Sequence, residues 1–351
     1  MESYQDQAPG RAISWAGPPA PSAARRPGTT LLEVDNLSVS FQTAAGRLPA
    51  VDGVSFQIAR GEVLGLVGES GCGKSVTAHS LLRLIPSPPG RIERGRVHYA
   101  GRDLLKLPLS ELRRIRGHKI SMIFQDPLTA LSPLQRIGAQ LTETLRLHQR
   151  IGRRAAWQTG MDWLARVGLA DPAARMLAYP HQCSGGMRQR VMIAMALMLG
   201  PDLIIADEPA TALDLTIQAQ IFELMLTMKE RRASILLISH DLGVVEGLCD
   251  RVLVMYASRL VEEAPTPDLF ANPLHPYTRA LLNSIPARQS RGGRLAAIPG
   301  QVPSPLHYPR GCHFQERCPL VSARCRMAKP ALVAMGSQRR VACFRAGLEG
   351  I

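Results

Sequence analysis

The stretch Glu62-Val63-Leu64-Gly65-Leu66-Val67-Gly68-Glu69-Ser70-Gly71-Cys72-Gly73-Lys74-Ser75 decides how this chain folds. It begins with a short apolar run typical of a buried strand, and a helical pattern over Ser75–Leu84 follows it. The turn between them has the spacing G-x-x-x-x-G-K-[ST], whose glycines let backbone N–H groups wrap around phosphates. The alternative is a glycine-rich turn that happens to precede a lysine, and the flanking strand and helix argue against it. The sequence therefore predicts a site for nucleotide phosphates.

Every residue of this loop is a candidate nucleotide contact: Gly68, Glu69, Ser70, Gly71, Cys72, Gly73, Lys74 and Ser75. We expect Lys74 to reach the β- and γ-phosphates and the Ser75 hydroxyl to bind Mg²⁺.

A second apolar run, Leu203-Ile204-Ile205-Ala206, ends in the carboxylates Asp207 and Glu208. Ligands of open α/β sheets bind at the carboxyl ends of the strands, which is where these two side chains would lie. We expect Asp207 to support Mg²⁺, directly or through water, and Glu208 to orient and polarise an attacking water. An Asp-Glu pair that only starts a helix is the alternative, and the phosphate loop weighs against it.

Strand and helix patterns alternate along the chain, which is typical of an α/β protein with a largely parallel central sheet. Further strands are predicted at Leu31–Phe41, Val54–Ile58, Ile120–Phe124 and Ile235–Ser239, and helices within residues 134–180 and at Met187–Leu199, the latter capped by Ser184. No internal repeat is visible, so we expect one nucleotide-binding unit.

Composition narrows the class of protein further. The 351 residues suit about two domains. No apolar run approaches the roughly 20 residues that span a bilayer, and the N-terminus lacks a signal-peptide core, so we expect a cytoplasmic protein. The formal net charge of +14 suits nucleic acid, an anionic membrane face, or simply a solvated arginine-rich surface.

Cys183-Ser184-Gly185-Gly186-Met187-Arg188-Gln189-Arg190 resembles the signature motif of ABC proteins. The resemblance implies an ABC-type P-loop cassette with a RecA-like core, an antiparallel β subdomain and an α-helical signature subdomain. It further implies ATP and Mg²⁺ as cofactors and a head-to-tail cassette dimer. In that dimer, Ser184, Gly185, Gly186 and Met187 contact the γ-phosphate held by the opposite cassette.

Other positions resemble further motifs of the same superfamily. Gln125 resembles the Q-loop residue that senses Mg²⁺ and couples to membrane subunits, Asp214 lies in a D-loop-like stretch, and His240 resembles the switch histidine. Phe41 resembles the aromatic residue that stacks on adenine. Each of these types is also common in purely structural roles. A non-hydrolysing regulatory cassette is disfavoured because Lys74, Asp207, Glu208 and His240 are all present.

The stretch Asn272-Pro273-Leu274-His275-Pro276-Tyr277-Thr278 and the SGGMRQR version of the signature resemble one branch, the ATP-binding subunits of dipeptide, oligopeptide and nickel importers. This implies a peripheral protein on the cytoplasmic face of the inner membrane. Its partners would be two permease subunits and a second ABC ATPase, either a different chain or a copy, and indirectly an extracytoplasmic solute-binding protein. The alternative is an ABC ATPase acting on the ribosome or nucleic acid, but such proteins generally hold two cassettes, so no nucleic acid is expected.

The predicted organisation is a disordered leader over residues 1–29, the nucleotide-binding cassette over 30–270, and a C-terminal extension over 271–351. The extension contains Cys312, Cys318, Cys325 and Cys343. In a cytoplasmic protein such a cluster favours metal over disulfides, and its spacings leave iron–sulfur, zinc or no metal open. The importer resemblance implies a [4Fe–4S] cluster at these four residues, with a structural role.

Overall fold

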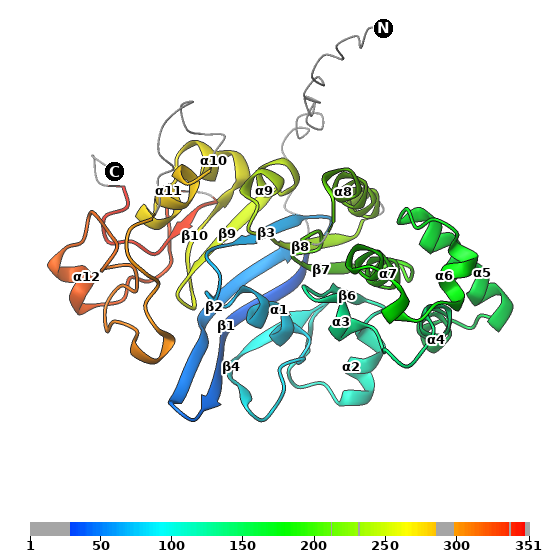
Figure 1. The fold of residues 1–351 in the computed structure, drawn as a ribbon. Helices are drawn as coiled ribbons and strands as arrows, with labels where there is room; N and C mark the ends of the chain where they lie inside the picture. The colour runs from blue at the N-terminus through cyan, green and yellow to red at the C-terminus, as the bar shows by residue number, and fades with distance from the viewer. Residues whose placement is uncertain (1–28, 212, 231, 286–297, 337, 348–351) are drawn as a thin grey trace, which may run out of the picture.

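The computed structural model describes residues 29–347 except 212, 231, 286–297 and 337 (Figure 1). The strands are β1 Thr30–Thr43, β2 Gly46–Ala59, β3 Val63–Val67, β4 Gly90–Tyr99, β5 Arg102–Asp103, β6 Ile120–Ile123, β7 Leu203–Asp207, β8 Ser234–Ile238, β9 Arg251–Tyr256, β10 Arg259–Pro265, β11 Val333–Ala334 and β12 Arg340–Val341. The helices are α1 Lys74–Leu81, α2 Leu109–Ile115, α3 Pro127–Ala130, α4 Ile137–His148, α5 Arg153–Arg166, α6 Pro172–Leu177, α7 Gly185–Leu197, α8 Leu215–Glu230, α9 Leu242–Leu248, α10 Thr266–Ala271, α11 Pro276–Asn283 and α12 Ala323–Met327, with 3₁₀ turns at Pro180–Gln182 and Pro305–His307. The predicted α/β class is confirmed, whereas the predicted leader, apart from Thr29, lies outside the described residues.

The larger sheet has the strand order β11-β12-β10-β9-β3-β8-β7-β6. Strands β9, β3, β8, β7 and β6 run parallel, and β3, β6, β7 and β8 are buried along their whole length, as their Val-, Ile- and Leu-rich sequences require. Parallel strands place their carboxyl ends at one edge of a sheet. The loops that follow β3 and β7 therefore lie close together, as the sequence predicts.

The smaller sheet is antiparallel, with the order β2-β1-β4-β5, and it corresponds to the expected β subdomain. Its apolar face and one face of the larger sheet share a single core, which includes Leu37, Phe56, Leu81, Leu236 and Leu253. Helix α1 contacts β1, β2 and β7, so it lies between the two sheets. The phosphate loop that precedes α1 is therefore held from both sides.

Helices cover the other face of the larger sheet and form a second core with it. Helices α4, α5 and α6 pack on one another at one end of the molecule, on the right in Figure 1. Gly138 lets α4 approach closely, since a Cβ there would stand 2.6 Å from the Met176 carbonyl oxygen and 2.7 Å from the Trp157 ring. In the part of the chain that the structure describes, no helix is long and apolar enough to cross a membrane.

The C-terminal extension lies at the opposite end, drawn in orange and red in Figure 1. Strand β12 pairs with β10 through Glu262 to Val341 and Glu263 to Arg340, so the extension lengthens the larger sheet. Arg340 and Arg251 both form ion pairs with the buried Glu263. The extension is thus attached to the cassette by backbone pairing and by buried charge.

Candidate nucleotide-binding site

The phosphate loop joins β3 to α1, as predicted, and its glycines have conformations that residues with side chains rarely adopt. Gly68, Gly71 and Gly73 have φ of +149°, +76° and +107°. A Cβ at Gly68 would lie 2.1 Å from the Met255 carbonyl oxygen, and one at Gly73 would lie 2.2 Å from that of Ala50. The loop is therefore pressed against the strands beneath it, and its glycines let the backbone approach a phosphate closely.

Lys74 is the first residue of α1 and is only 7% exposed. Its ammonium donates to the carbonyl oxygens of Gly68, at 2.7 Å, and Glu69, at 3.0 Å. The Lys74 ammonium therefore lies inside the phosphate loop, where the sequence predicts that it contacts the phosphates.

Asp207 ends β7 and is 1% exposed, with no hydrogen-bond partner for its Oδ1 atom. Burial raises the pKa of the Asp207 carboxyl, and a hydrogen bond from Ser75 and the nearby His79 partly oppose this shift. A buried, unpaired carboxylate oxygen beside a hydroxyl is a donor set that fits Mg²⁺, a hard cation that prefers oxygen ligands. Ser75 and Asp207 are the residues that would hold the ion.

The three residues predicted to act in hydrolysis meet at the carboxyl edge of the sheet. Glu208 Oε2 accepts from the Gln125 amide at 3.2 Å, and Glu208 Oε1 lies 3.4 Å from His240 Nδ1. Glu208 has φ of +49°, an uncommon conformation for a residue with a side chain and one that clusters at active sites. Thr211 Oγ1 lies 3.3 Å from Glu208 Oε2, a contact that sequence analysis did not predict.

His240 is held by the turn that follows β8. The Asp241 N–H donates to Ser239 Oγ at 3.0 Å, and the Asp241 carboxylate caps α9 by accepting from Gly243 and Val244. The His240 side chain is 65% exposed, so it can meet a ligand while its backbone is fixed.

The signature segment lies elsewhere on the cassette. Ser184 caps α7 as predicted and accepts from the Met187 N–H at 3.3 Å. Among the described residues, no hydrogen bond joins Ser184–Met187 to the phosphate loop. Further along α7, the buried Gln189 donates to the Pro209 carbonyl at 2.6 Å and so links the signature helix to the segment after Glu208.

Two other predicted positions have more modest surroundings. Asp214 precedes α8 and accepts from the Ile217 N–H at 3.0 Å, as a helix cap does. Phe41 is half-buried on β1, and its ring approaches the backbone of Gly90 on β4. Its stacking on adenine stays a prediction.

Glu69 has partners that sequence analysis missed. Its carboxylate accepts hydrogen bonds from Arg317 Nη1 at 2.7 Å and from Arg317 Nη2 at 2.9 Å. Its N–H donates to the Tyr277 hydroxyl at 2.9 Å. Tyr277 belongs to the stretch Asn272–Thr278 that resembles the importer branch, and Arg317 immediately precedes Cys318. No spacing rule connects residues about 210 to 250 positions apart, so only the folded structure reveals this contact.

The cysteines of the extension line one cavity, together with His275, Phe314 and other residues. The four cysteines in the lining of this cavity are Cys312, Cys318, Cys325 and Cys343. Backbone N–H groups of Phe314, Leu320 and Arg345 donate to the sulfurs of Cys312, Cys318 and Cys343. Within the described ranges, no set of three or more His, Cys, Asp or Glu side chains is close enough to hold a single metal ion. The predicted cysteine cluster therefore exists as the lining of a cavity, without the closed geometry of a one-ion site.

The phosphate loop, the hydrolytic group around Glu208 and a separate helical subdomain with a capped signature helix define a nucleotide-binding cassette of the ABC class. The ABC transporter family matches residues 51–211, and the C-terminal region of oligopeptide/dipeptide transporters matches residues 261–325.

Individual proteins support the same assignment. The chain is 50% identical over 317 residues to the probable peptide ABC transporter ATP-binding protein y4tR of Sinorhizobium fredii, covering 90% of this chain and 95% of that protein. It is 48% identical to the oligopeptide transport ATP-binding protein OppD of Salmonella typhimurium, covering 92% and 96%. The dimeric, post-hydrolysis structure of the ATP-binding cassette MJ0796 bound to ADP and Pi matches with a TM-score of 0.61 at 25% identity, over 67% of this chain and 98% of that chain.

The chain belongs to the ABC transporter family, as an ATP-hydrolysing ATP-binding subunit that carries the C-terminal region of oligopeptide/dipeptide transporters.

Proposed function

We propose that this subunit drives an importer for dipeptides, oligopeptides or related small solutes such as nickel chelates. The observation that carries the proposal is the joint presence of a complete hydrolytic group and the oligopeptide/dipeptide C-terminal region in one chain. The relatives with the same organisation have names that specify peptide or oligopeptide transport. None of these names points to the ribosome or nucleic acid, so that alternative gains no support.

When bound, MgATP supplies the phosphoanhydride bond that is split and the cation that neutralises its oxygens. Lys74 holds the β- and γ-phosphates, while Ser75, Asp207 and Gln125 orient the metal side of the site. Glu208 accepts the proton of the attacking water at its carboxylate, and His240 steadies the γ-phosphate. Phe41 stacks on the adenine ring.

We infer that two cassettes close head-to-tail, with Ser184, Gly185, Gly186 and Met187 of each completing the other's site. The exposed N-terminus of α7 supports this role, because its first N–H groups and its dipole suit an anion. Asp214 would lie at the cassette interface. The partner cassette is either a related ATPase chain or a second copy of this one.

The segment after Gln125 offers a surface for two membrane permease subunits. Leu128 is 59% exposed and Leu134 is 87% exposed, and both follow the glutamine that contacts Glu208. Exposed leucines next to a catalytic loop suit an apolar partner helix. Movement of that partner would reach Glu208 through Gln125.

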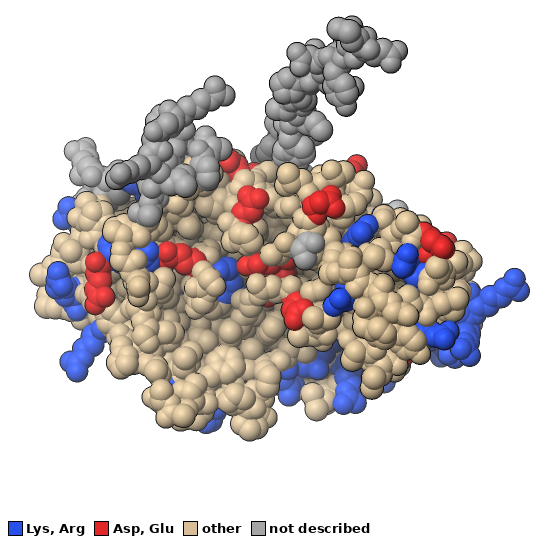
Figure 2. All heavy atoms as spheres, viewed as in Figure 1, with Lys and Arg blue, Asp and Glu red and all other residues tan. Residues whose placement is uncertain are grey.

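Basic side chains near the helical subdomain suit the anionic cytoplasmic face of the inner membrane. Figure 2 shows Lys and Arg along the lower and right rims, including the side of the helical subdomain, and also at the left edge, with carboxylates across the middle. Arg150, shortly before α5, and Arg153 and Arg154, at its start, are exposed. Anionic lipid headgroups attract such basic side chains over about one Debye length.

The partners can be identified by purifying tagged Glu208→Gln chain with MgATP from gently solubilised membranes, followed by mass spectrometry. The nucleotide-free wild-type chain is the matched control. Two polytopic permease subunits together with a second ABC ATPase, or a second copy, support the proposal. Ribosomal proteins or nucleic acid without any permease contradict it.

We also propose that Cys312, Cys318, Cys325 and Cys343 hold a [4Fe–4S] cluster with a structural role. Four thiols line one cavity, and N–H groups donate to three of the sulfurs, which would stabilise the thiolates that an iron–sulfur cluster requires. Burial raises the pKa of the Cys312 thiol to about 11, and a bound cationic centre would offset that cost by stabilising the thiolate. Such a group would tie together the loops of the extension.

The metal content of anaerobically purified protein tests this assignment. We expect iron and acid-labile sulfide in the wild-type chain and in Cys249→Ala, which removes a buried thiol of the cassette outside the cavity. Both should be lost in Cys325→Ser. Stoichiometric zinc without iron or sulfide contradicts the proposal.

A further inference from the structure

Glu69, the second residue of the phosphate loop, is fixed through three different groups. Its carboxylate receives the Arg317 guanidinium through two hydrogen bonds, and its N–H donates to the Tyr277 hydroxyl. Its carbonyl accepts from the Lys74 ammonium at 3.0 Å. Two of these three groups come from the C-terminal extension rather than from the cassette.

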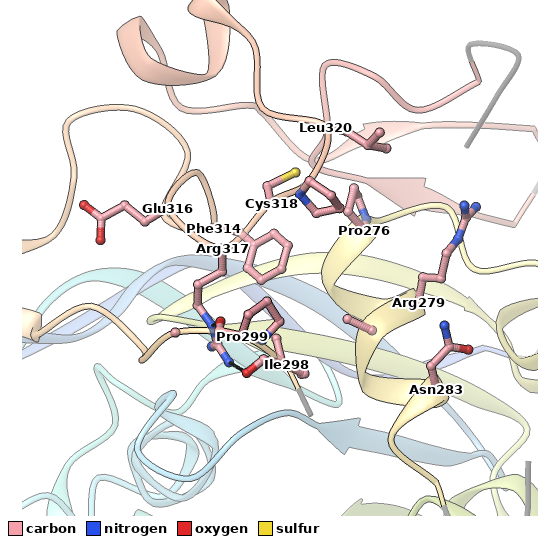
Figure 3. A pocket seen from close by; sticks show the side chains of 13 residues that line it. Pro276, Arg279, Asn283, Ile298, Pro299, Phe314, Glu316, Arg317, Cys318 and Leu320 are labelled. Atoms are coloured by element: carbon pink, nitrogen blue, oxygen red, sulfur yellow. Dashed lines mark hydrogen bonds between the residues drawn. The ribbon is translucent and has the colours of Figure 1, made fainter. Parts of the chain in front are cut away.

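The Arg317 side chain is built into the structure, since it is 4% exposed. Besides Glu69, its guanidinium donates to the Pro299 carbonyl at 2.8 Å and approaches the Ile298 carbonyl and the Tyr256 hydroxyl at 3.4 Å. Figure 3 shows Arg317 directed toward Ile298 and Pro299, while the neighbouring Glu316 points away. A planar guanidinium with its donors engaged has little freedom to turn away from Glu69.

Aromatic rings surround this ion pair. The Phe314 ring centroid lies 5.2 Å from that of Tyr256 and 5.5 Å from that of Tyr277, and Tyr256 and Tyr277 are 4.6 Å apart. The Arg317 guanidinium carbon lies 5.7 Å from the Tyr256 centroid. The cluster excludes water from one side of the pair and keeps the Tyr277 hydroxyl in place.

A second set of contacts holds the turn beneath the phosphate loop. His313 Nδ1 lies 2.8 Å from the Ala257 carbonyl oxygen, and the Tyr308 hydroxyl lies 2.8 Å from Ser258 Oγ. The Ser258 N–H in turn donates to the carbonyl of Cys72 at 3.0 Å. The extension thus reaches the loop both at Glu69 and through the β9–β10 turn.

We propose that Arg317 and Tyr277 are positioning residues for ATP binding: the extension acts as a clamp that holds Glu69, and with it the phosphate loop, in the shape that receives the phosphates. Neither side chain need touch the nucleotide. Because the clamp acts on the loop in every state of the reaction, its loss should weaken ATP binding more than it slows the chemical step.

The test uses the full-length, anaerobically purified chain and measures equilibrium binding of the fluorescent analogue N-methylanthraniloyl-ATP with Mg²⁺, together with KM and kcat. Arg317→Gln should raise Kd and KM at least about tenfold, equivalent to about 1.4 kcal/mol. It should leave kcat at saturating ATP within roughly threefold. Arg317→Lys, which keeps the charge but not the paired hydrogen bonds, should recover part of the affinity.

The matched control is Arg279→Gln on α11. Arg279 and Arg317 both line a cavity of about 480 Å³ (Figure 3), but the Arg279 guanidinium donates to the Pro273 carbonyl rather than to Glu69. The Kd of Arg279→Gln should equal that of the wild type. The double variant Glu69→Gln/Arg317→Gln should lose no more affinity than Arg317→Gln alone, because the two substitutions break the same ion pair.

A folded Arg317→Gln that binds the analogue with wild-type affinity and shows only a lower melting temperature overturns the proposal. If Arg317→Gln does not fold, Tyr277→Phe decides. It keeps the buried ring and removes only the acceptor for the Glu69 N–H, and it should raise Kd about threefold or more. Unchanged Kd in Tyr277→Phe also overturns the proposal.

Discussion

Replacing Gly73 with alanine should impair ATP hydrolysis by displacing the phosphate loop. A Cβ at Gly73 would lie 2.2 Å from the Ala50 carbonyl oxygen, whereas real Cβ contacts stay beyond 3.0 Å, so the backbone must move by about 0.8 Å. Errors of about 1 Å in a catalytic arrangement cost on the order of 100-fold in rate. We therefore expect kcat/KM to fall roughly 100-fold, or about 2.7 kcal/mol.

The positive φ of Gly73 adds a separate backbone cost, which a second glycine isolates. Gly61, in the turn between β2 and β3, has φ of +71° and no atom within 4 Å of its would-be Cβ. Gly61→Ala should lose about 1–2 kcal/mol of unfolding free energy and keep its hydrolysis rate. Phosphate release at varied ATP and urea unfolding measure both quantities, and Gly73→Ala with kcat/KM within about threefold of wild type would refute the reasoning.

Further predictions concern single titratable groups. Glu208→Gln should bind ATP normally and hydrolyse it roughly 10²- to 10⁴-fold more slowly, measured by phosphate release, and unchanged turnover would contradict its assigned role. Because burial raises the pKa of Asp207, its folded form binds more protons than its unfolded form. Its contribution to the free energy of unfolding therefore falls as pH rises from the unfolded-state pKa through the raised folded-state pKa. Asp207→Asn should consequently melt at a higher temperature without nucleotide, but it should lose Mg²⁺-dependent hydrolysis. Burial lowers the pKa of His275 to about 3, so the unfolded chain binds the extra proton between about pH 6.5 and 3. The free energy of unfolding should therefore decline as pH falls through this window, and the decline should be smaller in His275→Asn. An equal dependence of unfolding free energy on pH in the wild type and in His275→Asn would contradict this prediction.

The elements with strong periodicity could be predicted from the sequence. Strands β3, β6, β7 and β8 are short apolar runs that end at turns or carboxylates, and α7 begins at a serine cap. Their burial on both faces of a parallel sheet produces those runs directly. Asp207 and Glu208 could be placed from the sequence because they come at the end of β7. Lys74 could be placed because it follows the loop after β3.

Other elements gave weaker signals. Strand β4, Gly-Arg-Ile-Glu-Arg-Gly-Arg-Val-His-Tyr, carries many charges because several of its side chains face solvent, and it was missed. Strand β2 starts at Gly46, earlier than the predicted Val54, since Pro49 interrupts the apolar pattern. Strands β11 and β12 span only two residues each and depend on pairing with β10.

The site was least predictable where it depends on contacts between distant segments. The pairing of Glu69 with Arg317 joins the phosphate loop to the cysteine segment, which sequence analysis treated as separate units. A charged residue beside a cysteine is too common a pattern to indicate a partner. Only the packing of α11 and the 311–318 segment against β9 brings the two together.

The most direct test of the proposed function is uptake by the purified complex reconstituted in proteoliposomes with its permease subunits, the co-purifying second ATPase, if one is found, and the solute-binding protein. Radiolabelled di- and oligopeptides, and a nickel chelate in parallel, are offered with MgATP present on the side of this subunit. ATP-dependent accumulation of at least one of these solutes, abolished by Glu208→Gln in this chain, is the predicted result. ATP hydrolysis by a fully assembled complex without accumulation of any of them would contradict the importer function.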